Sequence, residues 1–332
     1  MRKYKICICG GGNISHVLAG LLSNKGHTIN VLTRKPKKWS KKISVLFKNN
    51  NYEGNLNTIS NNSKNVIPSC DIIIVSCPVT AINDIITNIN PFLTKNMTLI
   101  NIPGRFFINY TKHLENNIIT FARTPYICRI KEYGNSVEVY GTVYKNINYW
   151  TNNPLLSKTI LKNLFDFDIN LLKNHFSIDL INSNLLLHST RLFVLFNKKT
   201  FYDHIPLFYG DWNNESSELL IKCDNELQKL INKMNETQTN NIYIKPIIEH
   251  YEVNDSVSLT NKIKNITAFK SILSPMKLIN NHYIPDFNNR YFLEEQIGLK
   301  IIIDLSNEYN INIPYITSVY NFIITVKTQY FY

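Results

Sequence analysis

The stretch Lys5-Ile-Cys-Ile-Cys-Gly10-Gly-Gly-Asn-Ile-Ser15 decides the fold of the first part of the chain. Its first half is β-prone and ends at consecutive glycines. Residues 13–24 then carry apolar side chains at helical spacing, Gly26 ends that pattern, and residues 28–33 have the composition of a second strand. Because neighbouring parallel strands need a helical crossover, this order predicts a right-handed βαβ unit.

The turn between the first strand and the first helix fits the pattern G-x-G-x-x-small. It consists of Gly10, Gly11, Gly12, Asn13, Ile14 and Ser15. The first glycine permits the tight turn, the second lets a pyrophosphate approach the backbone, and the small last residue lets helix and strand come close. The helix N-terminus then offers unpaired N–H groups and the positive end of its dipole. The motif in this context predicts a dinucleotide-binding site.

The end of the second predicted strand bears on the choice of cofactor. It carries Thr33-Arg34-Lys35, where sites that prefer NAD carry an acidic residue. An arginine accommodates a 2′-phosphate, Lys37 and Lys38 add positive potential, and Trp39 is a candidate to stack on adenine. We therefore expect NADPH rather than NADH. A solvated basic loop is the alternative interpretation of this cluster.

Two further turns are expected to line the same site. The apolar runs at 71–76 and 97–102 predict central strands, and ligands of doubly wound sheets lie outside the carboxyl ends of strands. Cys77, Pro78 and Asn101 follow or end these runs, so they are candidate neighbours of the ribose and nicotinamide. Ordinary turn chemistry is the alternative explanation for these residues.

The chain as a whole is long enough for two domains, with 332 residues of which 44% are hydrophobic. Strands at 118–121 and 137–143 and a helix at 81–89 complete a β-rich first part, whereas the Asn-rich stretch 49–65 is expected to be a polar loop. Helical spacing then dominates at residues 155–164, 178–196, 216–234, 259–269 and 293–309. We predict an α/β protein: an N-terminal Rossmann domain with a doubly wound parallel sheet at residues 1–150, and an all-helical C-terminal domain at 151–332.

Composition argues against several other classes of protein. The net charge of +12 is a weak nucleic-acid signal, because its densest cluster is already explained by the phosphate pocket. The 6 cysteines include no CxxC pair, and no His/Cys spacing is typical of a metal site, so we expect reduced thiols and no metal. No apolar run is long enough for a membrane span, and the N-terminus lacks a secretory pattern. The expectation is a cytoplasmic protein with small-molecule substrates and neither nucleic-acid nor membrane partners.

Several segments outside the glycine turn carry a more specific resemblance. Thr124–Gly134 and Val137–Thr142 are similar to the middle segment of octopine dehydrogenase and its opine dehydrogenase relatives. Asn184–His188 and Pro206–Tyr209 are similar to the start of the helical domain of that family, and Pro285–Glu295 to a later motif. The segments occur in the family's order over nearly the whole chain, which thus resembles the octopine/opine dehydrogenases of the NAD/NADP octopine/nopaline dehydrogenase superfamily.

The resemblance implies an NAD(P)-dependent oxidoreductase acting on CH–NH donors. Such an enzyme condenses a 2-oxo acid, with pyruvate as the first candidate, with an amino acid and reduces the imine to an N-(carboxyalkyl)amino acid. The family uses a His–carboxylate pair, which falls here on His188 and Glu295, although better-known members carry aspartate at the second position. An imidazole that titrates near neutrality suits the proton transfers, and a carboxylate fixes its tautomer.

The same resemblance suggests residues that bind substrate. Arg290 matches the arginine that contacts the amino acid, and Cys128 lies where the family contacts substrate, with a buried thiol as the alternative. Arg105 stands where the octopine enzyme has an uncharged polar residue, so it implies either a different amino acid or a second carboxylate clamp. Asn184 is a candidate to orient the substrate or the His188 ring.

Two other functions remain open from the sequence. A simple 2-oxo-acid or ketopantoate-type reductase would need no amine, but such enzymes usually depend on a catalytic lysine in the helical domain, and no lysine here stands in a comparable motif. A non-catalytic dinucleotide-binding regulator is the second alternative.

Overall fold

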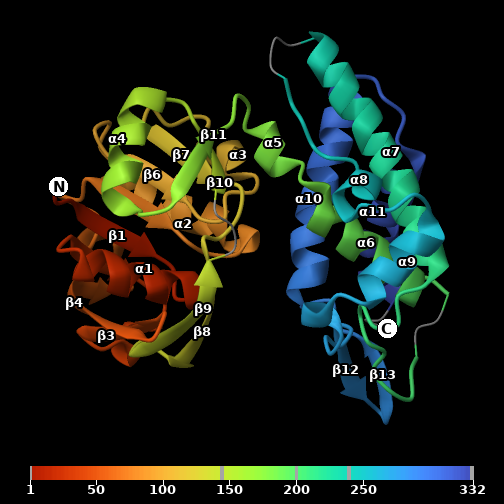
Figure 1. Ribbon diagram of the computed structural model, residues 1–332, viewed down its shortest axis with the longest axis horizontal. Helices are drawn as coiled ribbons and strands as arrows, with labels where there is room; N and C mark the ends of the chain where they lie inside the picture. The colour runs from red at the N-terminus through yellow and green to blue at the C-terminus, as the bar shows by residue number, and fades with distance from the viewer. Residues whose placement is uncertain (1, 143–145, 199–200, 238–240, 330–332) are drawn as a thin grey trace. The chain divides into compact units, whose positions relative to one another are not determined.

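The structure is a computed structural model that describes residues 2–142, 146–198, 201–237 and 241–329. The chain divides into two compact units, Met1–Asp179 and Leu180–Tyr332 (Figure 1). The division falls later than the predicted boundary after residue 150, because the helix and the strand that follow residue 151 both belong to the first unit.

A mixed sheet forms the centre of the first unit. Its strands are β1 (Lys5–Cys9), β2 (Thr28–Leu32), β3 (Lys42–Phe47), β4 (Asn50–Ser60), β5 (Ile72–Val75), β6 (Thr98–Asn101), β7 (Asn117–Phe121), β8 (Tyr126–Glu132), β9 (Ser136–Thr142), β10 (Asn146–Thr151) and β11 (Asp168–Leu171). Within the described residues they are ordered β11-β10-β7-β6-β5-β1-β2-β4-β3-β9-β8. The strands from β7 to β4 in this order pair in parallel, and antiparallel pairs flank them on both sides.

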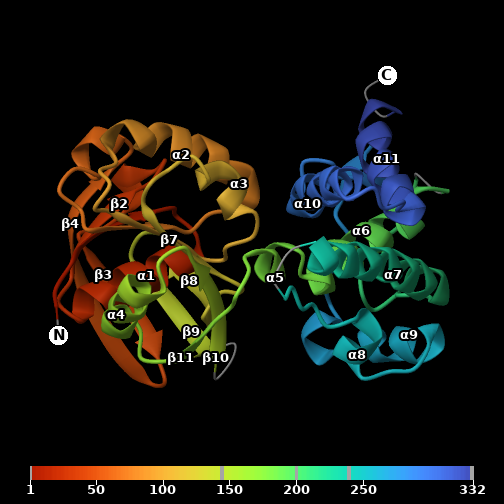
Figure 2. The same ribbon diagram turned by 90° about the horizontal axis from the view of Figure 1, so that it is seen from above.

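Helices cover both faces of this sheet. They are α1 (Asn13–Asn24), α2 (Ile82–Ile89), α3 (Phe107–Thr111) and α4 (Pro154–Leu164), followed by the short α5 (Phe176–Asp179). In Figure 2, α2 and α3 lie on one side of the strands and α1 and α4 on the other. Side chains of β1 alternate accordingly: Ile6 and Ile8 are buried with α1 and α4, whereas Cys7 and Cys9 are buried with α2. The predicted Rossmann architecture is confirmed.

Helix α1 lies unusually close to the strands beneath it. A Cβ added at Gly54 of β4 would lie 2.7 Å from the carbonyl oxygen of Gly20, and one added at Gly20 would lie 2.2 Å from Cγ2 of Val45. Both distances are shorter than real Cβ contacts, so only glycine at these two positions permits this approach.

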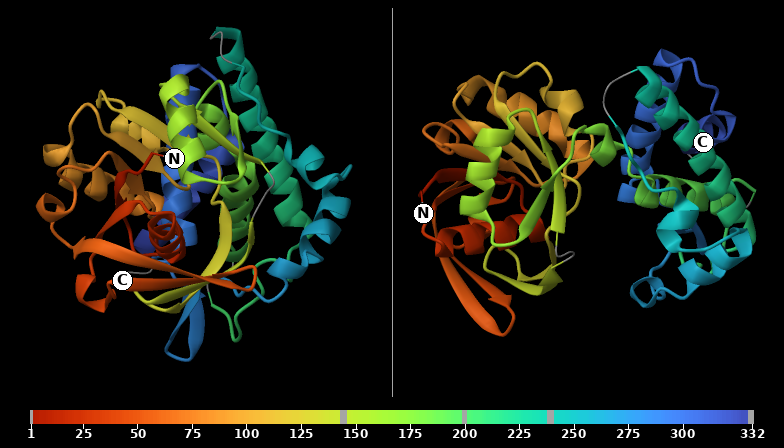
Figure 3. Two further views of the ribbon diagram at one scale, coloured as in Figure 1. Left: turned by 60° about the vertical axis from the view of Figure 1, so that its left-hand side comes forward. Right: turned by 45° about the horizontal axis from the view of Figure 1, so that its top comes forward.

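The second unit is helical, with one small hairpin. Its elements are α6 (Asn182–Phe196), α7 (Asn214–Thr237), α8 (Ile247–Tyr251), α9 (Ser256–Lys264), α10 (Arg290–Glu308) and α11 (Pro314–Gln329), with the hairpin β12 (Met276–Ile279) and β13 (His282–Pro285). Helix α6 contacts α7, α10 and α11 (Figure 3). Among the described helices, none combines the length and apolarity that crossing a bilayer requires.

Two predictions about single elements are wrong. The stretch 49–65 is not a polar loop, because most of it forms β4, in which Gly54 and Leu56 point inward between the polar Glu53, Asn55 and Asn57. The predicted helix 178–196 is interrupted, since the Asp179 carboxylate accepts a hydrogen bond from the backbone N–H of Phe106 at 2.5 Å and α6 begins only at Asn182. The last residue of the predicted strand 137–143 lies outside the described residues.

A buried carboxylate joins two helices of the second unit. Glu226 on α7 accepts hydrogen bonds from the backbone N–H groups of Tyr315 and Ile316, each at 2.9 Å, and is 5% exposed. These N–H groups belong to the first turn of α11, where no intrahelical partner exists and the helix dipole favours a negative charge.

We therefore expect Glu226→Ala to destabilise the protein. Loss of the charged acceptor leaves the buried Ile316 N–H and the partly buried Tyr315 N–H without this partner, which costs about 3 kcal/mol in free energy of unfolding. Urea unfolding followed by circular dichroism measures it, with Glu218→Ala as control, because Glu218 is exposed on the same helix. Equal stability of the two variants would contradict the capping role of Glu226.

Candidate functional site

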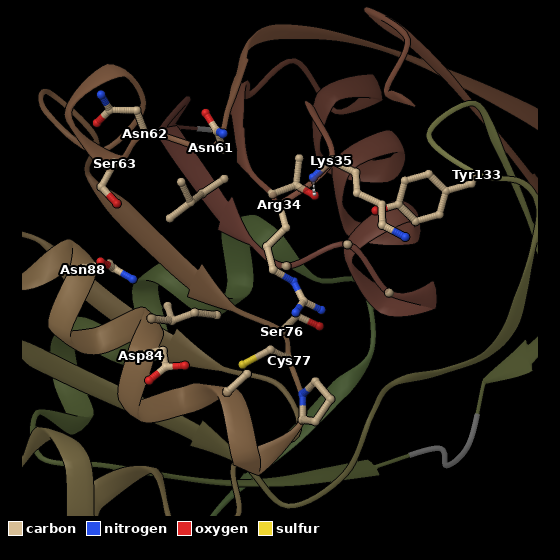
Figure 4. A pocket seen from close by; sticks show the side chains of 18 of the residues that line it. Arg34, Lys35, Asn61, Asn62, Ser63, Ser76, Cys77, Asp84, Asn88 and Tyr133 are labelled. Atoms are coloured by element: carbon tan, nitrogen blue, oxygen red, sulfur yellow. Dashed lines mark hydrogen bonds between the residues drawn. The ribbon is translucent and has the colours of Figure 1, made fainter. Parts of the chain in front are cut away.

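A cavity of about 830 Å³ lies in the first unit beyond the carboxyl ends of four parallel strands (Figure 4). Gly10–Gly12 follow β1, Thr33–Lys35 follow β2, Asn61–Ser63 follow β4, and Ser76–Pro78 follow β5. Asp84 and Asn88 reach it from α2. This is the edge at which doubly wound sheets bind ligands.

The glycine turn forms a cradle at one wall of this cavity. Gly10 has φ +148°, and a Cβ there would lie 2.2 Å from the carbonyl oxygen of Ser76. A Cβ at Gly11 would lie 2.6 Å from the Tyr133 hydroxyl oxygen, whereas one at Gly12 would meet nothing within 4 Å. The backbone at the start of α1 thus borders open space, and its N–H groups fit the diphosphate of a dinucleotide.

The rest of the turn holds the cradle in place and does not line the cavity. The Asn13 side chain accepts from the backbone N–H of Ile130 at 2.9 Å, Ile14 is buried in the core, and the Ser15 hydroxyl donates to the carbonyl oxygen of Ser76 at 3.2 Å. Asn101 is fully buried and donates to the carbonyl oxygen of Val75, which ties β5 to β6. These side-chain contacts support the turn, whereas contact of Asn13, Ile14 and Ser15 with the cofactor through their backbone N–H groups stays a prediction.

Basic side chains stand at the wall that follows β2. Arg34 and Lys35 are exposed, and Figure 4 shows the Arg34 side chain extending into the cavity. The Lys35 ammonium lies 5.9 Å from the centre of the Tyr133 ring. Lys37 and Lys38, expected to contribute, are exposed on a short 3₁₀ turn (Pro36–Lys38) and do not line the cavity.

The Trp39 indole packs inside the first unit. It is 7% exposed, and its ring centre lies 4.1 Å from that of His16, which argues against the expected stacking on adenine. His16 connects the glycine turn to the β8–β9 turn: Nδ1–H donates to the carbonyl oxygen of Gly12 and Nε2 accepts from Gly134 N–H, both at 2.8 Å. Burial lowers the pKa of His16, which favours the neutral ring that these two bonds require.

The candidate substrate residues Cys128 and Arg105 and the candidate cofactor residue Cys77 also belong to the first unit. Cys128 is 3% exposed in the hydrophobic core, and burial raises the pKa of its thiol to about 11, so the alternative interpretation as a packing residue is favoured. Cys77 does line the cavity, although burial raises its pKa to about 12 and keeps the thiol protonated at neutral pH. Arg105 is half-buried, with its guanidinium carbon 5.2 Å from the centre of the Phe106 ring.

The second unit brings His188 and Glu295 together. His188 lies on α6 and Glu295 on α10, and His188 Nδ1 is 2.9 Å from Glu295 Oε1. Glu295 is 1% exposed and His188 8%, so the pair is shielded from solvent. Because a buried carboxylate needs a donor, Nδ1 carries the proton and points it at Glu295. The longer side chain of glutamate thus still reaches the histidine.

Arg290 and Asn184 lie on the same two helices. Arg290 begins α10, is exposed, and has its guanidinium carbon 5.3 Å from the centre of the Tyr291 ring. Asn184 is exposed on α6, four positions before His188 and therefore near it on the helix surface. The described residues contain no cluster of three or more His, Cys, Asp or Glu side chains arranged for a metal ion.

Sequence reasoning missed several residues of these sites. Asn61–Ser63 escaped because the residues before them were taken for a loop, so no strand end was expected there. Asp84 carries no sequence signal, and Tyr133 stands in the quoted segment Thr124–Gly134 without being singled out there. The fold brings both residues to the cavity. Tyr209, which hydrogen-bonds His188, stands in a motif quoted for its resemblance, but nothing in the sequence pointed to this contact.

Comparison with known proteins finds relatives for both units. Residues 171–326 match the family described as NAD/NADP octopine/nopaline dehydrogenase, alpha-helical domain, and residues 6–102 match ketopantoate reductase PanE/ApbA. Octopine dehydrogenase of Pecten maximus is 24% identical over 339 residues, which cover 90% of this chain and 84% of the relative.

Solved structures share the fold. An octopine dehydrogenase determined with NADH and L-arginine has a TM-score of 0.82 at 22% identity, covering 97% of this chain and 89% of that one. A yersinopine dehydrogenase with NADP⁺ has a TM-score of 0.72 at 10% identity, covering 97% and 90%. Together these matches support the opine dehydrogenase family for this chain and indicate an NAD(P)-dependent oxidoreductase acting on CH–NH donors.

Proposed function

We propose that this protein is an NADPH-dependent opine dehydrogenase, which joins a 2-oxo acid to the amino group of an amino acid and reduces the resulting imine. The product is an N-(carboxyalkyl)amino acid, and pyruvate is the first candidate for the 2-oxo acid. The observation that carries the proposal is the buried His188–Glu295 pair, which lies within the segment that matches the helical domain of the family.

The pair fits the proton transfers of this reaction. The amino acid must lose a proton before its nitrogen attacks the carbonyl carbon, and the carbinolamine must gain one before its hydroxyl leaves as water. His188 accepts the first proton and returns the second, while the Glu295 carboxylate stabilises the imidazolium between these steps. NADPH, when bound, supplies the hydride that reduces the imine.

Cationic side chains suit substrates that are carboxylates. We assign the carboxylate of the amino acid to Arg290, because this arginine begins the helix that carries Glu295. Arg105 is the second candidate for binding a carboxylate, and Asn184 a candidate to orient the substrate near His188.

The preference for NADPH rests on the wall that follows β2. Thr33, Arg34 and Lys35 line the cavity there, and none is an acidic side chain that would hold the ribose hydroxyls of NADH and repel a 2′-phosphate. Relatives of this fold have been solved with either cofactor, which leaves this wall as the main argument for NADPH.

A substrate screen tests the proposed function directly. NADPH oxidation is followed with pyruvate and each amino acid in turn, and we expect turnover only when both are present. Turnover with a 2-oxo acid alone would instead favour the simple reductase suggested by the match of residues 6–102. Binding of NADPH without turnover of any pair would favour the regulator.

Arg34→Ala tests the cofactor assignment. Loss of a charge-assisted bond to the 2′-phosphate is expected to raise the KM for NADPH by roughly 10-fold or more, with less than about a 2-fold change for NADH. Lys38→Ala is the matched control, because Lys38 is exposed nearby but does not line the cavity. An equal rise for both cofactors in Arg34→Ala would reject the phosphate role.

His188→Ala tests the acid–base assignment. We expect kcat to fall by about 10²- to 10⁴-fold while NADPH still binds with wild-type affinity. His282→Ala serves as control, because His282 lies in the same unit but is exposed. Activity of His188→Ala near that of His282→Ala would remove His188 from the mechanism.

A further inference from the structure

Both ring nitrogens of His188 are hydrogen-bonded within the second unit. Nδ1 meets Glu295 Oε1 at 2.9 Å, and Nε2 meets the hydroxyl oxygen of Tyr209 at 2.8 Å. Tyr209 is 4% exposed, so all three members of this chain of hydrogen bonds are buried. The proposed function uses two members of the chain and gives Tyr209 no role.

The direction of each bond follows from its partners. A carboxylate only accepts, so the proton of the neutral imidazole sits on Nδ1 and the lone pair on Nε2. The Tyr209 hydroxyl therefore donates to Nε2. When the ring is protonated, Nε2–H donates to the Tyr209 oxygen, and the phenolic hydrogen is then free to turn to another acceptor.

This arrangement limits how His188 exchanges protons. Nδ1 faces Glu295, so a proton that reaches or leaves the ring on the substrate side has to use Nε2. Nε2 is already bonded to Tyr209, and the Tyr291 ring lies over the imidazole with its centre 4.5 Å away. As long as the hydrogen bond between Nε2 and Tyr209 is kept, a proton that moves between Nε2 and the substrate passes through the Tyr209 oxygen.

We infer that the Tyr209 hydroxyl is a proton relay between His188 Nε2 and the substrate. The inference rests on the proposed function and adds a third group to its His188–Glu295 pair. In the dehydration step, the Nε2–H bond breaks as a new O–H bond forms on Tyr209. The original phenolic O–H bond breaks at the same time, and its proton passes to the departing hydroxyl, which leaves as water. His188 and Tyr209 both end neutral, and the reverse movement takes up the proton of the amino group.

The surroundings of Tyr209 fit a relay that never forms phenolate. Burial, followed by the neighbouring Tyr291 phenol and a side-chain hydrogen bond with it, holds the pKa of the Tyr209 hydroxyl well above its usual range, so an anion is disfavoured. Tyr291 in turn adjoins Arg290, whose guanidinium carbon lies 5.3 Å from its ring centre. The relay thus ends near the cation to which we assign the substrate carboxylate.

The backbone that carries Tyr209 is held firmly. Arg191, 2% exposed on α6, donates through Nε to the carbonyl oxygen of Phe208 at 2.8 Å and through an Nη to that of Asp211 at 2.7 Å. The ring of Tyr209 also stacks on Phe269 with centres 4.5 Å apart. These contacts fix the hydroxyl at Nε2 without using the hydroxyl itself, so its removal is expected to leave the loop in place.

Tyr209→Phe deletes the relay oxygen and keeps the ring. Tyr202→Phe is the matched control, because it deletes a hydroxyl that donates to the carbonyl oxygen of Leu195 in the same unit. Rates are measured in single turnovers with NADPH, the 2-oxo acid and the amino acid found in the screen, in mixtures of H₂O and D₂O. Circular dichroism and thermal unfolding verify that each variant is folded.

For the relay we expect Tyr209→Phe to lower the rate by about 100-fold or more, the order lost with a proton-transfer group, at unchanged KM for NADPH. Two protons move together in the wild type, so a plot of its rate against the D₂O fraction should be curved. The same plot for the residual rate of Tyr209→Phe should be a straight line. A rate within about 10-fold of Tyr202→Phe overturns the relay.

Other outcomes also decide the question. A large loss with an unchanged curve makes Tyr209 a positioning residue and overturns the relay. If Tyr209→Phe does not fold, the wild-type profile decides alone, a curve supporting the relay and a line rejecting it. Absence of turnover in wild-type protein with every substrate pair would reject the proposed function itself, and the relay with it.

Discussion

The hydrogen bond between His188 and Glu295 is the interaction on which the buried polar centre of the second unit depends. A carboxylate buried to 1% exposure is costly without a donor, and His188 Nδ1 supplies one. This requirement selects one tautomer of the imidazole, turns the lone pair of Nε2 toward Tyr209, and orients α6 relative to α10. Glu295 forms this interaction at a donor–acceptor distance that is ordinary for a hydrogen bond.

The first unit depends on a different constraint, the close approach of backbone to backbone at the glycine turn. No side chain fits at Gly10, where the carbonyl of Ser76 occupies the space. Ser15 bonds that same carbonyl, and His16 joins the turn to Gly134 beside the cavity wall. The cradle is therefore shaped by residues of α1, by the segments that follow β1 and β5, and by the β8–β9 turn.

Elements with strong periodicity were predictable from the sequence. Helix α1 was placed correctly at residues 13–24, and the central strands fell where continuous apolar runs stood, because burial on both faces leaves an unmistakable composition. Strand β4 was missed because asparagine is unfavourable in strands, and its inward residues are small or isolated. The interruption before α6 escaped because it follows from the contact of Asp179 with Phe106, which is distant in sequence.

The residues of the candidate sites also divide into those that the sequence indicates and those that only the fold brings together. The spacing of the glycine turn predicts the cradle, and the resemblance to the opine dehydrogenases implies the pair His188 and Glu295. The structure shows that these two side chains meet, while their catalytic role stays a prediction. The sequence overestimated Lys37, Lys38 and Trp39, since proximity to Arg34 along the chain does not decide which side chains reach the cavity. Tyr209 and Tyr133 were missed because only tertiary packing selects them among 19 tyrosines.

The paired glycines at Gly20 and Gly54 have a consequence for how this enzyme tolerates variation. Helix α1 bears the cradle at one end, and its seat on β4 has no room for even a methyl group. A substitution at Gly54 would therefore tilt the helix and disturb nucleotide affinity, although this residue lies outside the cavity. The packing between α1, β3 and β4 thus restricts which residues positions 20 and 54 accept, although neither position lines the cavity.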